Sequence, residues 1–83
     1  MNWIDDKDRK TKEIIGSDLR TKSLRIAIHH QMGSPGVLFG SCNGDIEIHN
    51  KRLMAIDIKA AKKEFIAILK EKIAELLQEL EAF

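Results

Sequence analysis

The chain has 83 residues, of which 33% are charged and 43% are hydrophobic, a balance typical of a folded domain rather than a disordered segment. A chain of this length forms one core and leaves no room for two domains with a deep cleft between them, which argues against a conventional single-subunit enzyme. Fourteen Lys and Arg against thirteen Asp and Glu give a formal net charge of +1, so overall charge does not drive the protein onto nucleic acid or an anionic membrane.

Cys42 is the single cysteine, so an intramolecular disulfide cannot stabilise the small core. Tiny secreted domains usually depend on such bonds, and we therefore expect a reducing, cytoplasmic environment. The first residues lack the apolar stretch of a signal peptide, and no window approaches the roughly 20 apolar residues of a membrane span. Neither export by that route nor membrane insertion is expected.

Residues 1–22 are interpreted as a charged N-terminal arm that precedes an α+β domain over residues 23–83. Residues 5–13 are crowded with Asp, Lys, Arg and Glu, and Ile14, Ile15 and Gly16 follow them. This pattern is compatible with a short helix ended by glycine or with an irregular arm, and the sequence leaves both open. We expect Trp3 to anchor the arm onto the domain's core.

From Ser23 the hydrophobicity alternates with a period of two, which predicts a strand with one apolar face. The apolar side carries Leu24, Ile26, Ile28, His30 and Met32. Gly, Ser, Pro and Gly at 33–36 predict a tight loop, after which residues 37–40 resume extended structure.

Asn43 and Gly44 are typical of a two-residue hairpin turn, because both residues tolerate the positive φ that such a turn requires. Counting outward from that turn pairs Phe39 with Ile48 and Leu38 with His49. Phe39 would then face the core, whereas Leu38 would face away from it. A second turn at residues 50–51 would lead into another extended run over residues 52–56, completing a small antiparallel β-meander.

Residues from about 58 to 83 predict one long helix, with Asp57 as its N-cap and no Gly or Pro inside it. The predicted fold is therefore α+β, a small antiparallel β-meander packed against one long C-terminal α-helix. About 26 residues at 1.5 Å each give roughly 39 Å, longer than the ~30 Å diameter of a compact chain of this size. We expect the helix to overhang its sheet.

The overhang predicts self-association, since a broad apolar stripe on an exposed helix invites another surface. The expected homo-oligomer interface consists of Ile66, Leu69, Ile73, Leu76, Leu77, Leu80 and Phe83. Lysines dominate the first half of the helix and glutamates its end, the reverse of what the helix dipole favours. An antiparallel partner helix would place each lysine-rich half beside a glutamate-rich half. The alternative is a solvated face without a partner.

The chain carries no ligand-type spacing for zinc and no established phosphate-loop motif, so neither a metal nor another cofactor is expected. His29 and His30 are neighbours on a strand and therefore point to opposite faces. A glycine-containing loop can still let an anion approach the backbone, and the start of a helix favours anions. The residues proposed to bind an anion are Arg25, His29, His30, Ser34, Lys59 and Lys62.

The leading functional hypothesis is a non-catalytic homo-oligomer that sequesters a small anionic, nucleotide-like ligand between subunits, where neighbouring chains add pocket depth. The alternative is an adaptor or inhibitor that binds a protein through a sheet edge or through Leu38, Met54 and Ile56. A nucleic-acid-binding dimer using Arg20, Lys22 and Arg25 is a third, less favoured hypothesis, because interleaved aromatic residues are lacking. Ligand identity and subunit number lie beyond the sequence.

Overall fold

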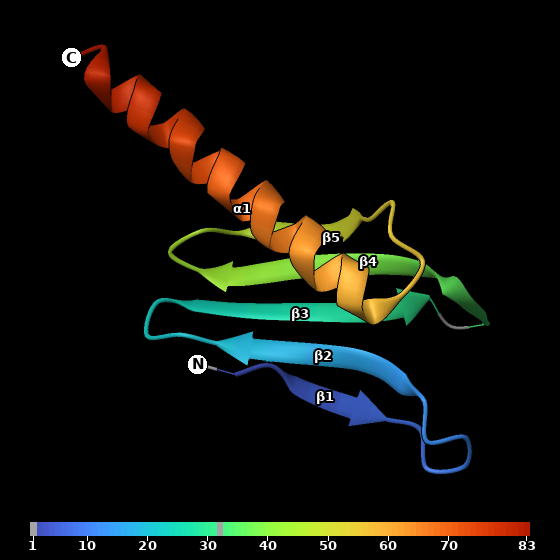
Figure 1. Cartoon of the computed structure of the whole chain (residues 1–83). Helices are drawn as coiled ribbons and strands as arrows, with labels where there is room; N and C mark the ends of the chain where they lie inside the picture. Colours follow the sequence, from blue (N-terminus) through green and yellow to red (C-terminus); the bar gives the residue numbers. More distant parts are fainter. Residues whose placement is uncertain (1, 32) are drawn as a thin grey trace.

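The computed structural model describes residues 2–31 and 33–83, which form a five-stranded antiparallel sheet followed by one long helix (Figure 1). The strands lie side by side in chain order, β1-β2-β3-β4-β5. Their bounds are Ile4–Lys7 for β1, Ile14–Arg20 for β2, Leu24–Gln31 for β3, Ser34–Gly44 for β4 and Ile48–Arg52 for β5, and α1 covers Ile58–Glu81. The predicted architecture, a β-meander packed against a C-terminal helix, is confirmed.

The N-terminal segment is neither a helix nor an irregular arm, because β1 and β2 lie within it and belong to the same sheet. Gly16 on β2 pairs with His29 on β3 and with Asp6 on β1. β1 was not predicted because its sequence is charged and shows no alternation of apolar residues. All four residues of this edge strand are exposed, so it needs no apolar face. In the turn that follows, the Asp8 carboxylate accepts hydrogen bonds from the backbone amides of Thr11 and Lys10, which lower its pKa.

The alternation predicted for β3 is confirmed, because Ile26 and Ile28 are buried whereas His29 is exposed. The loop predicted at residues 33–36 is shorter than expected. β4 already begins at Ser34, which pairs with Gln31, and the next pair joins His30 to Leu38. Residues 35–37 therefore form a bulge. The turn-forming residues of this segment had instead predicted a loop. Met32, predicted on the apolar side of the strand, lies outside the described residues.

The hairpin register predicted from Asn43 and Gly44 is wrong. Both residues belong to β4, where Asn43 pairs with Arg25, and β5 begins only at Ile48. Gly44 does adopt a positive φ of 123°, but it does so beside the loop between β2 and β3, where a Cβ would lie 2.0 Å from the Ser23 carbonyl oxygen. Steric closeness to this loop, rather than a two-residue turn, is what requires glycine here.

The different register reverses the faces predicted for β4. Phe39 pairs with Arg52 and Cys42 with Ile48, and the register shifts between these pairs. Leu38 consequently enters the core with 1% exposure, whereas Phe39 lies on the opposite face beside His29. Counting outward from an ideal turn failed because it allowed neither for a longer connection nor for this irregularity.

The second predicted turn, at residues 50–51, lies inside β5, and residues 53–57 form the connection to α1 instead of another strand. Asn50 has the positive φ expected of a turn, 44°, and its backbone amide donates to the Ser41 hydroxyl at 3.2 Å. The connection is held by Glu64 of the helix, whose carboxylate accepts hydrogen bonds from the backbone amides of Met54 and Ala55 at 2.8 Å each.

The helix begins where it was predicted to begin. The Asp57 carboxylate accepts a hydrogen bond from the Ala60 amide at 2.8 Å, which satisfies one of the otherwise free donors of the first turn. Ala61, Phe65 and Leu69, each one turn further along, are the buried residues of α1. They pack against a core from β3, β4 and the β5–α1 connection, made up of Ile26, Ile28, Leu38, Cys42 and Leu53.

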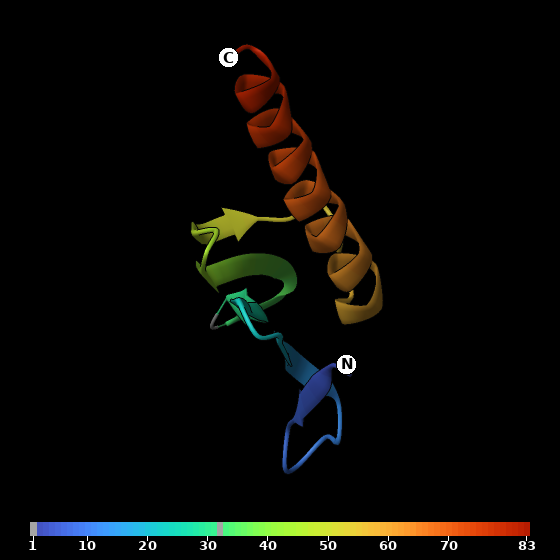
Figure 2. The same ribbon diagram turned by 90° about the vertical axis from the view of Figure 1, so that its left-hand side faces the viewer.

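The helix covers only one side of the sheet, and its C-terminal end projects beyond the sheet (Figure 2). Leu69 is the last buried residue, and all residues from Lys70 to Phe83 are exposed. The molecule is correspondingly elongated, with extents of 54 × 25 × 17 Å. The overhang predicted from helix length is therefore present, and we call residues 70–83 the helix overhang.

A substitution at Gly40 tests the contact between sheet and helix, because an added Cβ would lie 2.3 Å from Cδ1 of the buried Phe65 ring. We expect Gly40→Ala to destabilise the protein by about 1–3 kcal/mol through overpacking. Gly36→Ala is the matched control, since a Cβ added at Gly36 would meet no atom of the described residues within 4 Å. Urea unfolding followed by fluorescence of the single tryptophan measures both, and equal stability of the two variants would contradict the packing described.

Candidate functional site

The six residues predicted to bind an anion do not converge on one site. Arg25 and His29 lie on the sheet face opposite α1, which we call the open face, because they alternate along β3 with the buried Ile26 and Ile28. His30 lies on the helix side, in a depression that it lines together with Lys59. The other two residues lie elsewhere: Ser34 begins β4, and Lys62 reaches toward β1.

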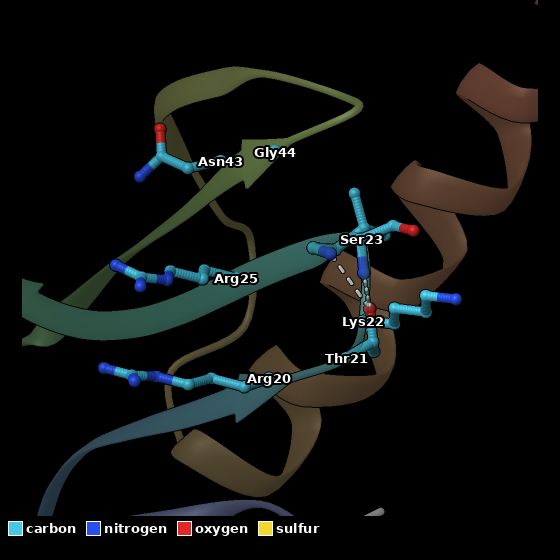
Figure 3. Close-up of a pocket in the computed structure, with 8 residues that line it drawn as sticks. Arg20, Thr21, Lys22, Ser23, Arg25, Asn43 and Gly44 are labelled. Atoms are coloured by element: carbon cyan, nitrogen blue, oxygen red, sulfur yellow. Dashed lines mark hydrogen bonds between the residues drawn. The ribbon is translucent and has the colours of Figure 1, made fainter.

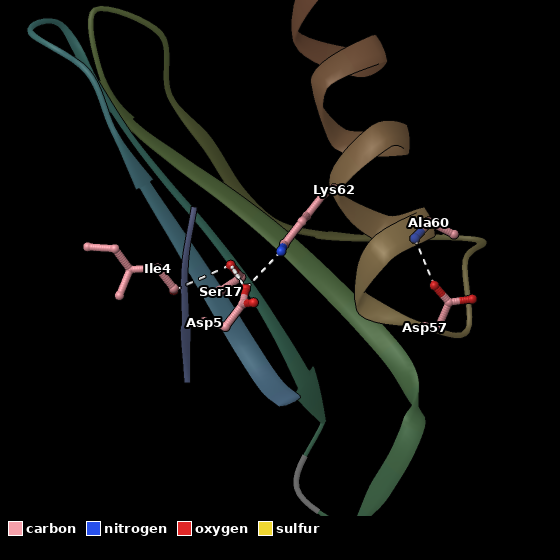
Figure 4. A network of polar contacts seen from close by, with 6 residues as sticks. All are labelled: Ile4, Asp5, Ser17, Asp57, Ala60 and Lys62. Atoms are coloured by element: carbon pink, nitrogen blue, oxygen red, sulfur yellow. Dashed lines mark hydrogen bonds and ion pairs between the residues drawn. The ribbon is translucent and has the colours of Figure 1, made fainter. Parts of the chain in front are cut away.

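Lys62 is engaged within the protein. Its ammonium group donates to the Asp5 carboxylate at 2.7 Å (Figure 4). The same group lies 5.5 Å from the centre of the Trp3 ring. The same carboxylate accepts a hydrogen bond from the buried Ser17 hydroxyl at 2.6 Å. Hydrogen bonds from Lys62 and Ser17 lower the pKa of Asp5. Lys62 therefore helps to hold β1 and the half-buried Trp3 against the domain, and its charge is already compensated.

The depression beside the start of α1 is a poor anion site. His30 and Lys59 line it, but so do the carboxylates of Asp8, Glu13 and Asp57. As the helix cap, Asp57 additionally occupies one of the N-terminal amides, that of Ala60. Since a neighbouring carboxylate repels an anion, these surroundings offset the attraction expected of a lysine and a helix N-terminus.

A different group of cations does come together, at the end of the sheet where β2 turns into β3. Arg20 pairs directly with Arg25, and Arg25 pairs with Asn43 on β4, so the three side chains share one face. Figure 3 shows them side by side and extended in the same direction. We call this set the arginine row. Lys22, in the adjoining loop, lines the same surface depression as these residues.

The loop that aligns the two arginines is held by Thr21. Its hydroxyl accepts hydrogen bonds from the backbone amides of Ser23 at 3.2 Å and Leu24 at 2.9 Å, and its own amide donates to the Leu24 carbonyl at 2.8 Å. The arginine row is thus held in place by local backbone geometry. Its signal in the sequence was two arginines flanking a short polar segment, but the contribution of Asn43 was missed because the hairpin register was wrong.

Placing two like charges directly opposite each other on a sheet is unfavourable, by up to about 1 kcal/mol. Among the residues the structure describes, the ion pairs within 4.0 Å are His49–Glu47 and Lys62–Asp5, so neither arginine is neutralised in this way. Asp18 lines a second depression together with Arg20, Arg25 and Asn43, so its single negative charge offsets part of the two positive charges. This arrangement favours an incoming anion, which guanidinium groups bind through paired N–H donors.

A second set of open-face residues lies further along the same strands. His29 pairs with Phe39, and Phe39 pairs with Arg52. The His29 and Phe39 rings are stacked, with centroids 6.0 Å apart and planes inclined by 20°. We call this set the aromatic row; Phe39 and Arg52 were not predicted as site residues. His29 lies four positions after Arg25 on β3, a distance of roughly 13 Å along the strand.

No cluster of three or more His, Cys, Asp and Glu suited to a metal occurs within residues 2–31 and 33–83. Cys42 is fully buried in the core, and burial raises the pKa of its thiol, which disfavours the reactive thiolate. The helix in the described part of the chain is not apolar enough over its length to cross a membrane.

Comparison with known proteins identifies no match: no family model, curated protein or solved structure matches this chain. The fold and the open-face residues are therefore the basis for the functional proposal.

The bond between Asp5 and Lys62 predicts an acid-sensitive contribution to stability. Because the pKa of Asp5 is lowered in the folded protein, its contribution is fully present above the ordinary aspartate value of 3.8 and is lost as the pH falls through the lower folded value. We expect Asp5→Asn to lower stability at neutral pH by less than about 1 kcal/mol, because the pair is partly exposed, and to flatten the acid slope.

Urea unfolding at a series of pH values measures this slope. Asp6→Asn, on the same exposed strand, is the matched control and should keep the wild-type slope. Asp8 has a lowered pKa as well, so part of the slope should persist in the Asp5 variant. An identical acid slope in wild type and Asp5→Asn would show that the contact contributes nothing.

Proposed function

We propose that this protein is a non-catalytic, homo-oligomeric binding protein whose open face holds a phosphate-bearing, nucleotide-like anion. The observation that supports this most directly is the arginine row. Arg20 and Arg25 lie directly opposite each other, and neither is engaged in an ion pair among the described residues. Two neighbouring guanidinium groups can bind phosphate oxygens through paired N–H donors, whereas isolated lysines supply only point charges.

The aromatic row supports a nucleotide-like ligand rather than a bare inorganic anion. The exposed His29 ring and the half-buried Phe39 ring offer a surface on which a base can stack, and Arg52 is placed beside them. Because roughly 13 Å separates the two rows along β3, a ligand contacting both must be longer than a single phosphate. The proposed ligand therefore combines phosphate groups and at least one planar ring.

Self-association through α1 is part of the same proposal. The helix overhang exposes Leu77 and Leu80 by 54% and 68%, which supports a role as an interface. The arginine row, however, lies on the face of the sheet opposite the helix. The proposal therefore separates the ligand site from the helix interface, instead of placing the ligand between subunits as the sequence had suggested.

Changing Arg20 and Arg25 together to Gln should weaken binding of a phosphate-bearing ligand by about tenfold or more, because a hydrogen bond to a charged group contributes roughly 1.5–3 kcal/mol. Stability should stay constant or rise slightly, since the change removes a repulsive cross-strand pair. Calorimetric titration with pyrophosphate, ATP and a short single-stranded oligonucleotide measures the affinity, and thermal unfolding measures the stability.

The matched control is Arg9→Gln with Lys10→Gln, which removes the same charge from the exposed β1–β2 turn at the other end of the sheet. Equal loss of affinity in both double variants would indicate general electrostatics and reject the arginine row as the site. Absence of binding by the wild-type protein to all three probes would reject the proposal. Binding to the oligonucleotide alone would redirect it to nucleic acid.

A protein-binding adaptor is the second candidate function, supported by two exposed apolar side chains in the β5–α1 connection. Met54 and Ile56 are 90% and 75% exposed. Leu38, the third residue proposed for this surface, is buried and is excluded from it. Met54→Ser with Ile56→Ser should abolish capture of a partner from lysate without loss of stability. Capture that persists in this variant would remove the surface from consideration.

A further inference from the structure

We propose that two copies of this chain pair through their helix overhangs in an antiparallel arrangement centred near Leu76. The inference rests on the self-association proposed above and specifies its partner, direction and register. The environment of α1 changes at Leu69. This residue is buried against its own sheet, and every later residue is exposed.

The overhang carries an apolar stripe that its own subunit leaves uncovered. Ile73, Leu76 and Leu80 follow one another at intervals of three and four residues and are 41%, 40% and 68% exposed. At 100° per residue they lie on one side of the helix, flanked by Leu77. The twelve helical residues 70–81 span roughly 18 Å, enough for several layers of side chains against a second helix.

The charges beside this stripe select the direction of the partner. Projection around the helix places Lys72 and Glu79 on one flank of the stripe, and Lys70 and Glu81 on the other. When Ile73 lies near Leu80 of the partner subunit, Lys72 approaches the partner's Glu79 and Lys70 approaches the partner's Glu81. Each pair occurs twice by symmetry. A parallel pair would instead bring the two lysine-bearing ends together and likewise the two glutamate-bearing ends.

The same charges favour a second copy over a lipid surface. Glu75, Glu79 and Glu81 lie in the overhang, and glutamates there would be repelled by an anionic headgroup layer. In an isolated subunit they lie unfavourably at the negative end of the helix dipole, and the partner's lysines relieve this. The antiparallel pair thus explains both the exposed leucines and the inverted order of charges.

The geometry leaves space for both sheets. Leu69 lies seven positions before Leu76, the centre of the proposed contact, which is about 10.5 Å along the helix. The Leu69 residues of the two subunits are therefore about 21 Å apart along the paired helices. The open faces are not covered by this contact, because each lies on the side of its sheet away from the helix (Figure 2). Pairing and ligand binding can therefore be measured separately.

A charge exchange tests the direction. Lys72→Glu and Glu79→Lys should each raise the dimer dissociation constant by roughly three- to tenfold, and the double variant should return it to within about twofold of wild type. Glu71→Lys, on the side of the helix opposite the stripe, is the matched control and should leave the constant unchanged. Sedimentation equilibrium measures association, and circular dichroism verifies that helix content is retained.

A parallel pair predicts no recovery in the double variant, so the lack of recovery would overturn the antiparallel arrangement. Leu76→Glu with Leu80→Glu should give a folded monomer. The helix residues buried within the subunit are Ala61, Phe65 and Leu69, and neither substitution changes them. A wild-type monomer at micromolar concentration would overturn pairing altogether. Titration of the same samples with pyrophosphate and ATP keeps the two proposals apart, since loss of pairing with retained binding rejects only the helix interface.

Discussion

The contact between Phe65 and Gly40 is the constraint on which the arrangement of sheet and helix depends. The Phe65 ring is fully buried, and it lies where a side chain at Gly40 would otherwise be. This close approach seats α1 directly on β4, so that Ala61 and Leu69, one turn to either side, meet the core as well. With one face of the sheet covered in this way, the polar residues that alternate along β2, β3 and β4 are left on the open face.

The parts of the fold that could be predicted from the sequence depend on local patterns. The Asp57 cap and the long periodic stripe located the helix, and strict alternation located β3, because both patterns report directly on burial. β1 lacked such a signal because both its faces are exposed. The β4–β5 register was mispredicted, because a bulge and a longer connection depend on packing between strands and change which residues face the core.

The same distinction applies to the candidate site. The sequence identified the cationic segments, but their pairing required the register of the sheet. Lys62 illustrates the limit, because its partner Asp5 lies 57 residues away and its charge is compensated only in the folded chain. Arg20 and Arg25 become significant for the opposite reason. The turn at Thr21 places them directly opposite each other, and neither forms an ion pair within the described part of the chain. Asn43, Phe39 and Arg52 join the open face only through strands whose register the sequence did not reveal.

The two edges of the sheet have a consequence for the kind of assembly the protein can form. β1 and β5 present unpaired backbone groups, which are templates for strand addition and fibre growth, yet both carry charged side chains, with Asp5, Asp6 and Lys7 on one and Lys51 and Arg52 on the other. Charged side chains on an edge strand disfavour its pairing with another edge. Edge-to-edge growth is therefore disfavoured, whereas the proposed twofold association along the helix would close on itself rather than continue into an open polymer.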